Sequence, residues 1–216
     1  MANTNQISGN RQGWYLLGAA LLLAAASIGY NIYEGSAGEP PEAAPQAGGE
    51  PSIEELRALA EASPGDARAW SNLGFAHFER SEFAAAAEAY RRATEADARQ
   101  AVLWSALGEA LVMASARDPL PPEALAAFEK ALALDPADPR ARYFLAVKKD
   151  LDKDHEGAIA AWLALLADTP RGAPWEADLV RTIEQVGQIN GIAVADRLAA
   201  TDAKRAEALA APGSGA

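Results

Sequence analysis

Apolar positions in the middle of the chain recur at a fixed interval. The interval from Trp70 to Trp104 equals that from Phe128 to Trp162. A fixed period of about 34 residues is typical of arrays in which each repeat is a pair of helices that stacks on the next pair. The pattern therefore predicts an all-α superhelix of three repeats. The predicted bounds are 67–100, 101–138 and 139–172, within a folded domain at 52–190.

Each predicted repeat sets a small residue on its first helix against an aromatic residue on its second helix. In the first repeat Trp70, Leu73, Gly74 and His77 are spaced at i, i+3, i+4 and i+7, so they share one helical face. The small residues at the equivalent positions are Gly74, Gly108 and Ala146, and the aromatic residues are Tyr90, Phe128 and Trp162. Small and large side chains interdigitate well. We therefore expect the two helices of a repeat to make close contact at these positions.

Shorter helical patterns flank the three repeats. Ser52 and Glu55 have the spacing of a capping box, which predicts a helix that covers the exposed face of the first repeat. The segment 174–190 predicts a capping helix on the other side, ended at Gly191. Residues 191–216 predict one more helix with a sparse apolar face, followed by a disordered tail.

A long apolar run near the amino terminus predicts a transmembrane helix. Residues 14–33 carry no charge, and about 20 residues suffice to cross a bilayer. Arg11 precedes the run and Glu34 follows it, so the positive-inside rule places 1–13 in the cytoplasm. Four prolines and four glycines in 34–51 predict a flexible linker. The alternative interpretation of the run is a cleaved signal peptide, and both interpretations export the repeats, most simply to a bacterial periplasm.

The composition of the chain excludes several classes of ligand and reaction. The net charge of -11 gives no electrostatic case for nucleic acid and favours basic partners. Cysteine is absent, which excludes thiol chemistry, disulfides and a covalent haem motif in this chain. Of the two histidines, His77 lies on the apolar face as a packing residue and His155 lies in a charged turn. No phosphate loop or nucleophile motif is present. We therefore expect a non-enzymatic protein without a bound cofactor or metal.

The remaining candidate for function is the second face of the first helix in each repeat, which lines the inner surface of a curved stack. Its mixture of aromatic, polar and charged side chains suits an amphipathic helix or an extended peptide, and Arg68 and Arg140 could hold a carboxylate. Two alternatives remain: Phe75, Val112 and Val147 could instead pack between repeats, and the segment after Gly191 could fill the surface. The predicted peptide-binding residues are Arg68, Ser71, Asn72, Phe75, Phe78, Val102, Ser105, Glu109, Met113, Arg140, Tyr143 and Val147.

On these positions the three units resemble tetratricopeptide repeats (TPR), over about half the chain. The third unit departs from the TPR pattern, with Arg142 in the tryptophan position and Lys149 in the tyrosine position. The second unit carries extra residues between its helices, around Ala116 to Pro122. The departures at Arg142 and Lys149 lead us to expect looser packing in the third repeat.

The order of the parts gives a narrower resemblance. A single apolar span, a Pro/Gly linker, about three repeats and a cap that begins Ala173-Pro174-Trp175 are similar to the TPR subunits of bacterial cytochrome c biogenesis. This resemblance implies a single-pass inner-membrane protein whose periplasmic TPR domain binds the carboxy-terminal helix of apocytochrome c. It further implies that the domain presents this helix to the haem-ligation subunits and carries no haem. A general periplasmic scaffold for envelope assembly or translocon-associated chaperoning is the alternative function.

Overall fold

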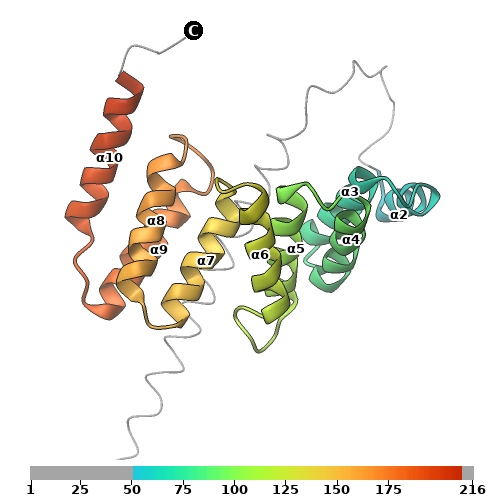
Figure 1. Cartoon of the computed structure of the whole chain (residues 1–216), viewed down its shortest axis with the longest axis horizontal. Helices are drawn as coiled ribbons and strands as arrows, with labels where there is room; N and C mark the ends of the chain where they lie inside the picture. The colour runs from blue at the N-terminus through green and yellow to red at the C-terminus, as the bar shows by residue number, and fades with distance from the viewer. Residues whose placement is uncertain (1–50, 211–216) are drawn as a thin grey trace, which may run out of the picture. The chain divides into compact units, whose positions relative to one another are not determined.

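The computed structural model of the chain describes residues 51–210 (Figure 1), and within them the backbone forms nine α-helices. This result confirms the predicted all-α class. The helices are α2 (Ile53–Ala62), α3 (Ala67–Glu79), α4 (Phe83–Ala96), α5 (Ala101–Ala114), α6 (Pro122–Leu134), α7 (Pro139–Leu151), α8 (His155–Asp168), α9 (Glu176–Asn190) and α10 (Ala195–Ala210).

The described chain forms two compact units, and the division falls inside α7. In the unit that ends at Leu145, α2 packs against α3, α3 against α4, α4 against α5, and α5 against α6. In the unit that begins at Ala146, α8 packs against α9 and against α10. Apart from the contact between α8 and α10, these contacts join helices that are consecutive in sequence, as expected for a helical repeat protein.

The helix ends follow from local chemistry. The capping box predicted at the start of α2 is present: Glu55 N donates to Ser52 Oγ at 3.2 Å, and Ser52 N donates to Glu55 Oε2 at 2.8 Å. Asp66 caps α3 by accepting from two backbone N–H groups. Gly191 ends α9 with a φ of 68°, a left-handed conformation that glycine adopts without steric cost. The first two contacts fix where α2 and α3 begin, and the third fixes where α9 ends.

Close approach between paired helices depends on the predicted glycines. A Cβ atom added to Gly74 would lie 2.9 Å from Tyr90 Cδ1, and one added to Gly108 would lie 2.6 Å from Phe128 Cε1. Both distances are shorter than carbon atoms tolerate without a shift. The predicted contact between a small residue and an aromatic ring is therefore confirmed in the first two repeats.

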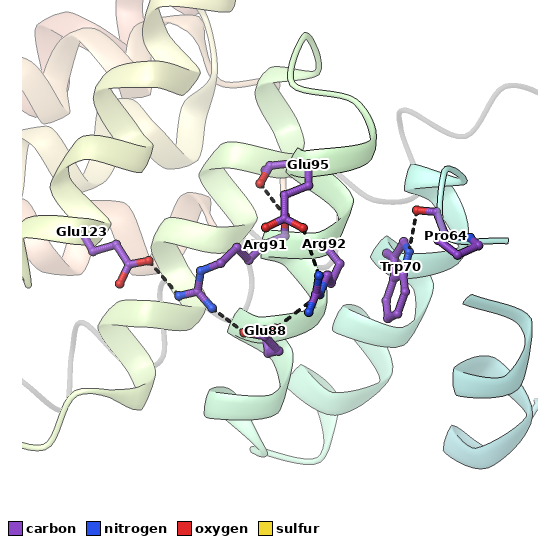
Figure 2. Close-up of polar contacts among 8 residues, drawn as sticks. Pro64, Trp70, Glu88, Arg91, Arg92, Glu95 and Glu123 are labelled. Atoms are coloured by element: carbon purple, nitrogen blue, oxygen red, sulfur yellow. Dashed lines mark hydrogen bonds and ion pairs between the residues drawn. The ribbon is translucent and has the colours of Figure 1, made fainter. Parts of the chain in front are cut away.

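Trp70 and Trp104, which recur at the repeat interval, also form hydrogen bonds with the turns between helices. Trp70 Nε1 donates to the carbonyl oxygen of Pro64 at 3.0 Å (Figure 2), and Trp104 Nε1 donates to that of Ala98 at 2.9 Å. Each indole thus reaches back to the turn that precedes its own helix. The repeat period therefore carries a hydrogen bond as well as an apolar contact.

The turns α3–α4 and α7–α8 share one form. The middle residue of each turn is left-handed, with φ of 59° at Ser81 and 68° at Lys153. A side-chain pair crosses each turn at the same relative position: His77 Nδ1 lies 2.5 Å from Glu82 Oε2, and Lys149 Nζ lies 3.7 Å from Asp154 Oδ2. The sequence departure at Lys149 therefore preserves a polar pair across the turn. His77 is buried, as its place on the apolar face predicted.

We expect Ser81→Gly and Lys153→Gly each to raise the free energy of unfolding by about 0.5–1 kcal/mol, because glycine adopts a positive φ without the Cβ clash. Urea denaturation followed by circular dichroism measures the change. Ala84→Gly, on an exposed position inside α4, is the matched control and should lower stability by about 1 kcal/mol. Equal destabilisation by all three glycines would contradict the argument.

Several predicted parts lie outside the described residues: the amino-terminal segment 1–13, the span 14–33, the linker 34–51 except its last residue, and the tail after 210. Within residues 51–210 no helix combines the length and apolar character needed to cross a membrane.

Candidate functional site

The predicted peptide-binding residues of α3 differ in their accessibility. Arg68 is exposed, and three of its neighbours on the helix are half-buried: Ser71, Asn72 and Phe75. Phe78 is buried, with its ring edge-on to Phe83 at a centroid separation of 5.2 Å. Phe78 thus closes the contact between α3 and α4, while the rest of this face reaches the surface.

On α5 and α7 most of the predicted residues are interior. Val102 and Met113 are half-buried. The buried residues are Ser105, Glu109, Arg140, Tyr143 and Val147. These five, like Phe78, present almost no accessible surface in the structure. The six predicted residues that remain accessible, at least in part, are Arg68, Ser71, Asn72, Phe75, Val102 and Met113. Contact of these six with a peptide stays a prediction.

Arg140 does hold a carboxylate, but that carboxylate belongs to this chain. Its Nε lies 2.6 Å from Glu109 Oε2, and its Nη1 donates to Ser105 Oγ at 3.0 Å. Ser105 Oγ in turn donates to Asp138 Oδ2 at 2.9 Å. We call these four residues the buried network. It joins α5 to the start of α7, so three predicted site residues act together as a structural link.

Asp138, the fourth member, escaped the sequence prediction. Its Oδ1 accepts from the backbone N–H of Ala141 at 2.7 Å, which caps the amino terminus of α7. Pro139 is the first residue of that helix, a position that suits proline because no intrahelical partner is needed for its nitrogen. An acidic residue directly before a proline that opens a helix is the signal that identifies it.

The buried network contains two carboxylates and one guanidinium. Burial raises the pKa of Glu109 to about 7, although the charge of Arg140 opposes this shift, and the negative charge of Asp138 adds to it. Burial likewise raises the pKa of Asp138, again against the attraction of Arg140. Glu109 Oε1 is buried and has no hydrogen-bond partner in the described part of the chain. With both carboxylates ionised, the buried network therefore carries one more negative than positive charge.

Other titratable groups between residues 51 and 210 form ion pairs and hydrogen bonds. His155 Nδ1 lies 2.6 Å from Asp150 Oδ1, a pair that links the start of α8 to α7. Among the residues that the structure describes, no cluster of three or more histidine, cysteine or acidic side chains could hold a metal ion.

An exposed ion-pair network covers part of α4 (Figure 2). Arg91 lies between Glu88 on the same helix and Glu123 on α6, at 2.6 and 2.7 Å, and Arg92 pairs with Glu88 and Glu95. Exposed pairs of this kind contribute on the order of 0–1 kcal/mol each. Both signs of charge alternate here, so this surface presents no single-sign patch to a partner.

Comparison with known proteins shows that this chain is similar in sequence to two proteins of cytochrome c-type biogenesis. No family model matches the chain. It is 35% identical over 127 residues to the cytochrome c-type biogenesis protein CycH of Bradyrhizobium diazoefficiens, which covers 59% of this chain and 34% of the relative. It is 34% identical over 113 residues to CycH of Rhizobium meliloti, covering 52% of this chain and 29% of the relative. The chain thus spans about a third of the length of these relatives.

The fold has a counterpart among solved structures. The crystal structure of the MamA protein matches with a TM-score of 0.53 at 17% identity, over 88% of this chain and 90% of that chain. At this identity the match concerns the fold alone. The chain is a distant homologue of the cytochrome c-type biogenesis protein CycH, and its paired helices have the TPR-like fold of MamA.

Proposed function

We propose that this chain binds a polypeptide segment during cytochrome c biogenesis and that the segment belongs to apocytochrome c. The homology to CycH carries this proposal, because both relatives are named for cytochrome c-type biogenesis and one of them matches 59% of the chain. An array of helix pairs suits such a role, since it offers an extended surface for a helix or peptide. The presentation of the bound segment to haem-ligation subunits is part of the same proposal.

The accessible part of α3 and α5 is the surface that we propose for the peptide. Phe75 supplies an aromatic anchor, and Val102 and Met113 supply half-buried apolar contacts. Arg68 is exposed and can pair with a carboxylate of the bound segment, a role for which Arg140 is already engaged by Glu109. The net charge of -11 favours a segment that is otherwise basic.

The location is also proposed from the sequence. Residues 14–33 would anchor the protein in the bacterial inner membrane, with the helix pairs on the periplasmic side. The linker at 34–51 would allow the domain to search for apocytochrome near the membrane. Labelling of single cysteine variants from either side of the membrane tests this topology, because the natural chain has no cysteine.

The proposal predicts that the chain binds a peptide from the carboxy-terminal helix of a c-type cytochrome with a submicromolar Kd. We expect Phe75→Ala to weaken binding by about tenfold or more, as loss of an aromatic anchor does at protein interfaces. Fluorescence anisotropy with a labelled peptide measures this, and circular dichroism verifies the fold of each variant. Lys130→Ala, exposed on α6, is the control and should bind like the natural chain.

Absence of binding by the folded chain would remove the apocytochrome proposal. Normal cytochrome c levels in a strain that lacks the protein would remove it as well. Copurification with membrane complexes in such a case would favour the alternative of a general envelope scaffold.

A further inference from the structure

The helix α10 packs against α8, and its buried side is only half apolar. Val194, directly before α10, and Leu198, Thr201 and Arg205 within it are spaced at i, i+4, i+7 and i+11, so they lie on one side. Val194 and Arg205 are buried, and Leu198 and Thr201 are half-buried. A core-facing helix of a repeat array normally carries a wider apolar stripe. The attachment of α10 therefore depends strongly on polar contacts.

Arg205 makes the central contact. Only 6% of this residue is exposed, and its Nη1 donates to Glu176 Oε1 at 2.5 Å while its Nη2 donates to the carbonyl oxygen of Thr169 at 2.9 Å. The ion pair is tight enough that the hydrogen bond from Arg205 lowers the pKa of Glu176. Thr169 follows α8 and Glu176 opens α9, so one side chain of α10 ties together the ends of two helices.

The same contact leaves one polar atom unsatisfied. Arg205 Nε is buried without a hydrogen-bond partner among the described residues. A buried donor without an acceptor weakens a contact, because it has given up its hydrogen bond to water. The junction of α8, α9 and α10 thus combines a specific ion pair with a buried donor that has no acceptor. This combination favours detachment of α10.

A second arginine fixes the direction of α10. Arg197 Nη1 lies 2.8 Å from Glu156 Oε2 at the start of α8, whereas Arg205 reaches Thr169 beyond its end, so the two helices run in the same direction. The two arginines are eight residues apart, about 12 Å along a helix. Glu156 and Glu176 are therefore two acidic side chains that can each pair with a basic residue, and these basic residues are just over two helical turns apart.

We propose that the surface of α8 and α9 beneath α10 is a helix-docking site, that α10 is its resident occupant, and that a basic partner helix displaces α10. The partner carries two Lys or Arg residues about eight positions apart, which replace Arg197 and Arg205 on Glu156 and Glu176. The short connection at 191–194, which begins at the left-handed Gly191, provides the hinge. This inference rests on the proposed function in so far as it assigns the chain a polypeptide ligand, but it concerns a different surface.

A synthetic peptide with the sequence of residues 192–210 of this chain is the probe. In full-length protein with Arg197→Ala and Arg205→Ala, α10 should be released from the site. This double variant should bind the labelled peptide at least about tenfold more tightly than the natural protein, because the natural protein's own α10 occupies the site at high effective concentration. A peptide with glutamine in place of both arginines should not bind. Lys204→Ala, exposed on α10, should leave peptide affinity unchanged.

Hydrogen exchange shows the state of the helices in the double variant. We expect faster exchange in α10 with protection retained in α8 and α9. A released α10 without peptide binding would overturn the docking site, and an α10 that stays protected would overturn the role of the arginines. Loss of protection in α8 and α9 would make α10 an integral part of the fold and would also overturn the proposal.

These outcomes are separable from those of the apocytochrome proposal. Phe75 lies on α3, outside the α8–α10 unit. Phe75→Ala in the background of the double variant should therefore leave binding of the 192–210 peptide intact. Failure of the cytochrome peptide to bind, with the 192–210 peptide still bound, would contradict the proposed function alone.

Discussion

Replacing Arg140 with methionine is expected to lower the free energy of unfolding by about 3–5 kcal/mol at pH 8, because removal of one partner of a buried ion pair leaves an uncompensated charge. Glu109 is 2% exposed, and its Oε2 lies 2.6 Å from Arg140 Nε. Methionine fills a similar volume, so lost charge pairing and not a cavity determines the result. Urea denaturation followed by circular dichroism measures the difference. Arg142→Met, on the same helix and half-buried, is the comparison and should cost much less.

The pH dependence of this loss has a defined sign. Burial raises the pKa of Glu109 from 4.5 to about 7, so between these values the folded chain holds a proton that the unfolded chain has released. Stability of the natural chain should therefore fall as pH rises through this window and become level above it. Without Arg140 the pKa of Glu109 rises further, so the penalty of Arg140→Met should stay level below a pH of about 7 and grow as the pH rises above it.

The Glu109→Gln variant removes the negative charge of this side chain and keeps its size and shape. Glutamine resembles the protonated carboxyl, so this variant should lose the part of the decline between pH 4.5 and 7 that Glu109 contributes. Added to Arg140→Met, it should restore part of the lost stability at pH 8. An Arg140→Met chain as stable as the natural one at pH 8 would show that the buried network contributes nothing to the fold.

The repeat architecture was predictable because its determinants are local and recur. Gly74 with Tyr90, and Gly108 with Phe128, are pairs within one repeat, and their spacing follows from helix geometry and a short turn. The capping box of Ser52 and Glu55 is likewise readable within a single helical turn. In each case the sequence separation is small enough that the position of one partner determines that of the other.

The candidate site was less predictable because its contacts join different repeats. A helical periodicity places Glu109 and Arg140 on similar faces of their helices, but it does not say whether the two side chains meet each other or a ligand. Arg140 meets Glu109 of the preceding repeat, and the same network includes Asp138. Burial of these charges depends on the register between α5 and α7, which single-helix patterns do not contain. The same reason explains α10, whose central contact is Arg205 and not an apolar residue.

Gly108→Val is expected to lower the free energy of unfolding by about 3 kcal/mol, since overpacking of a dense core forces side chains from their preferred positions. A Cβ at this position would lie 2.6 Å from Phe128 Cε1. Phe128 cannot retreat easily, because it is fully buried and stacks on Phe144 with a centroid separation of 4.5 Å. The better helix propensity of valine offsets less than about 1 kcal/mol of this cost. Urea denaturation gives the value.

Two further glycines calibrate the effect. A Cβ at Gly74 would approach Tyr90 to 2.9 Å, so Gly74→Val should destabilise the fold less than Gly108→Val. A Cβ at Gly65 would meet nothing within 4 Å, so the stability of Gly65→Val should stay within about 0.5 kcal/mol of the natural chain. Phe128→Ala, combined with Gly108→Val, should cost less than the sum of the single changes, because the smaller side chain makes room for valine. Strict additivity of the two losses would show that the glycine is not required for the approach of the phenylalanine ring.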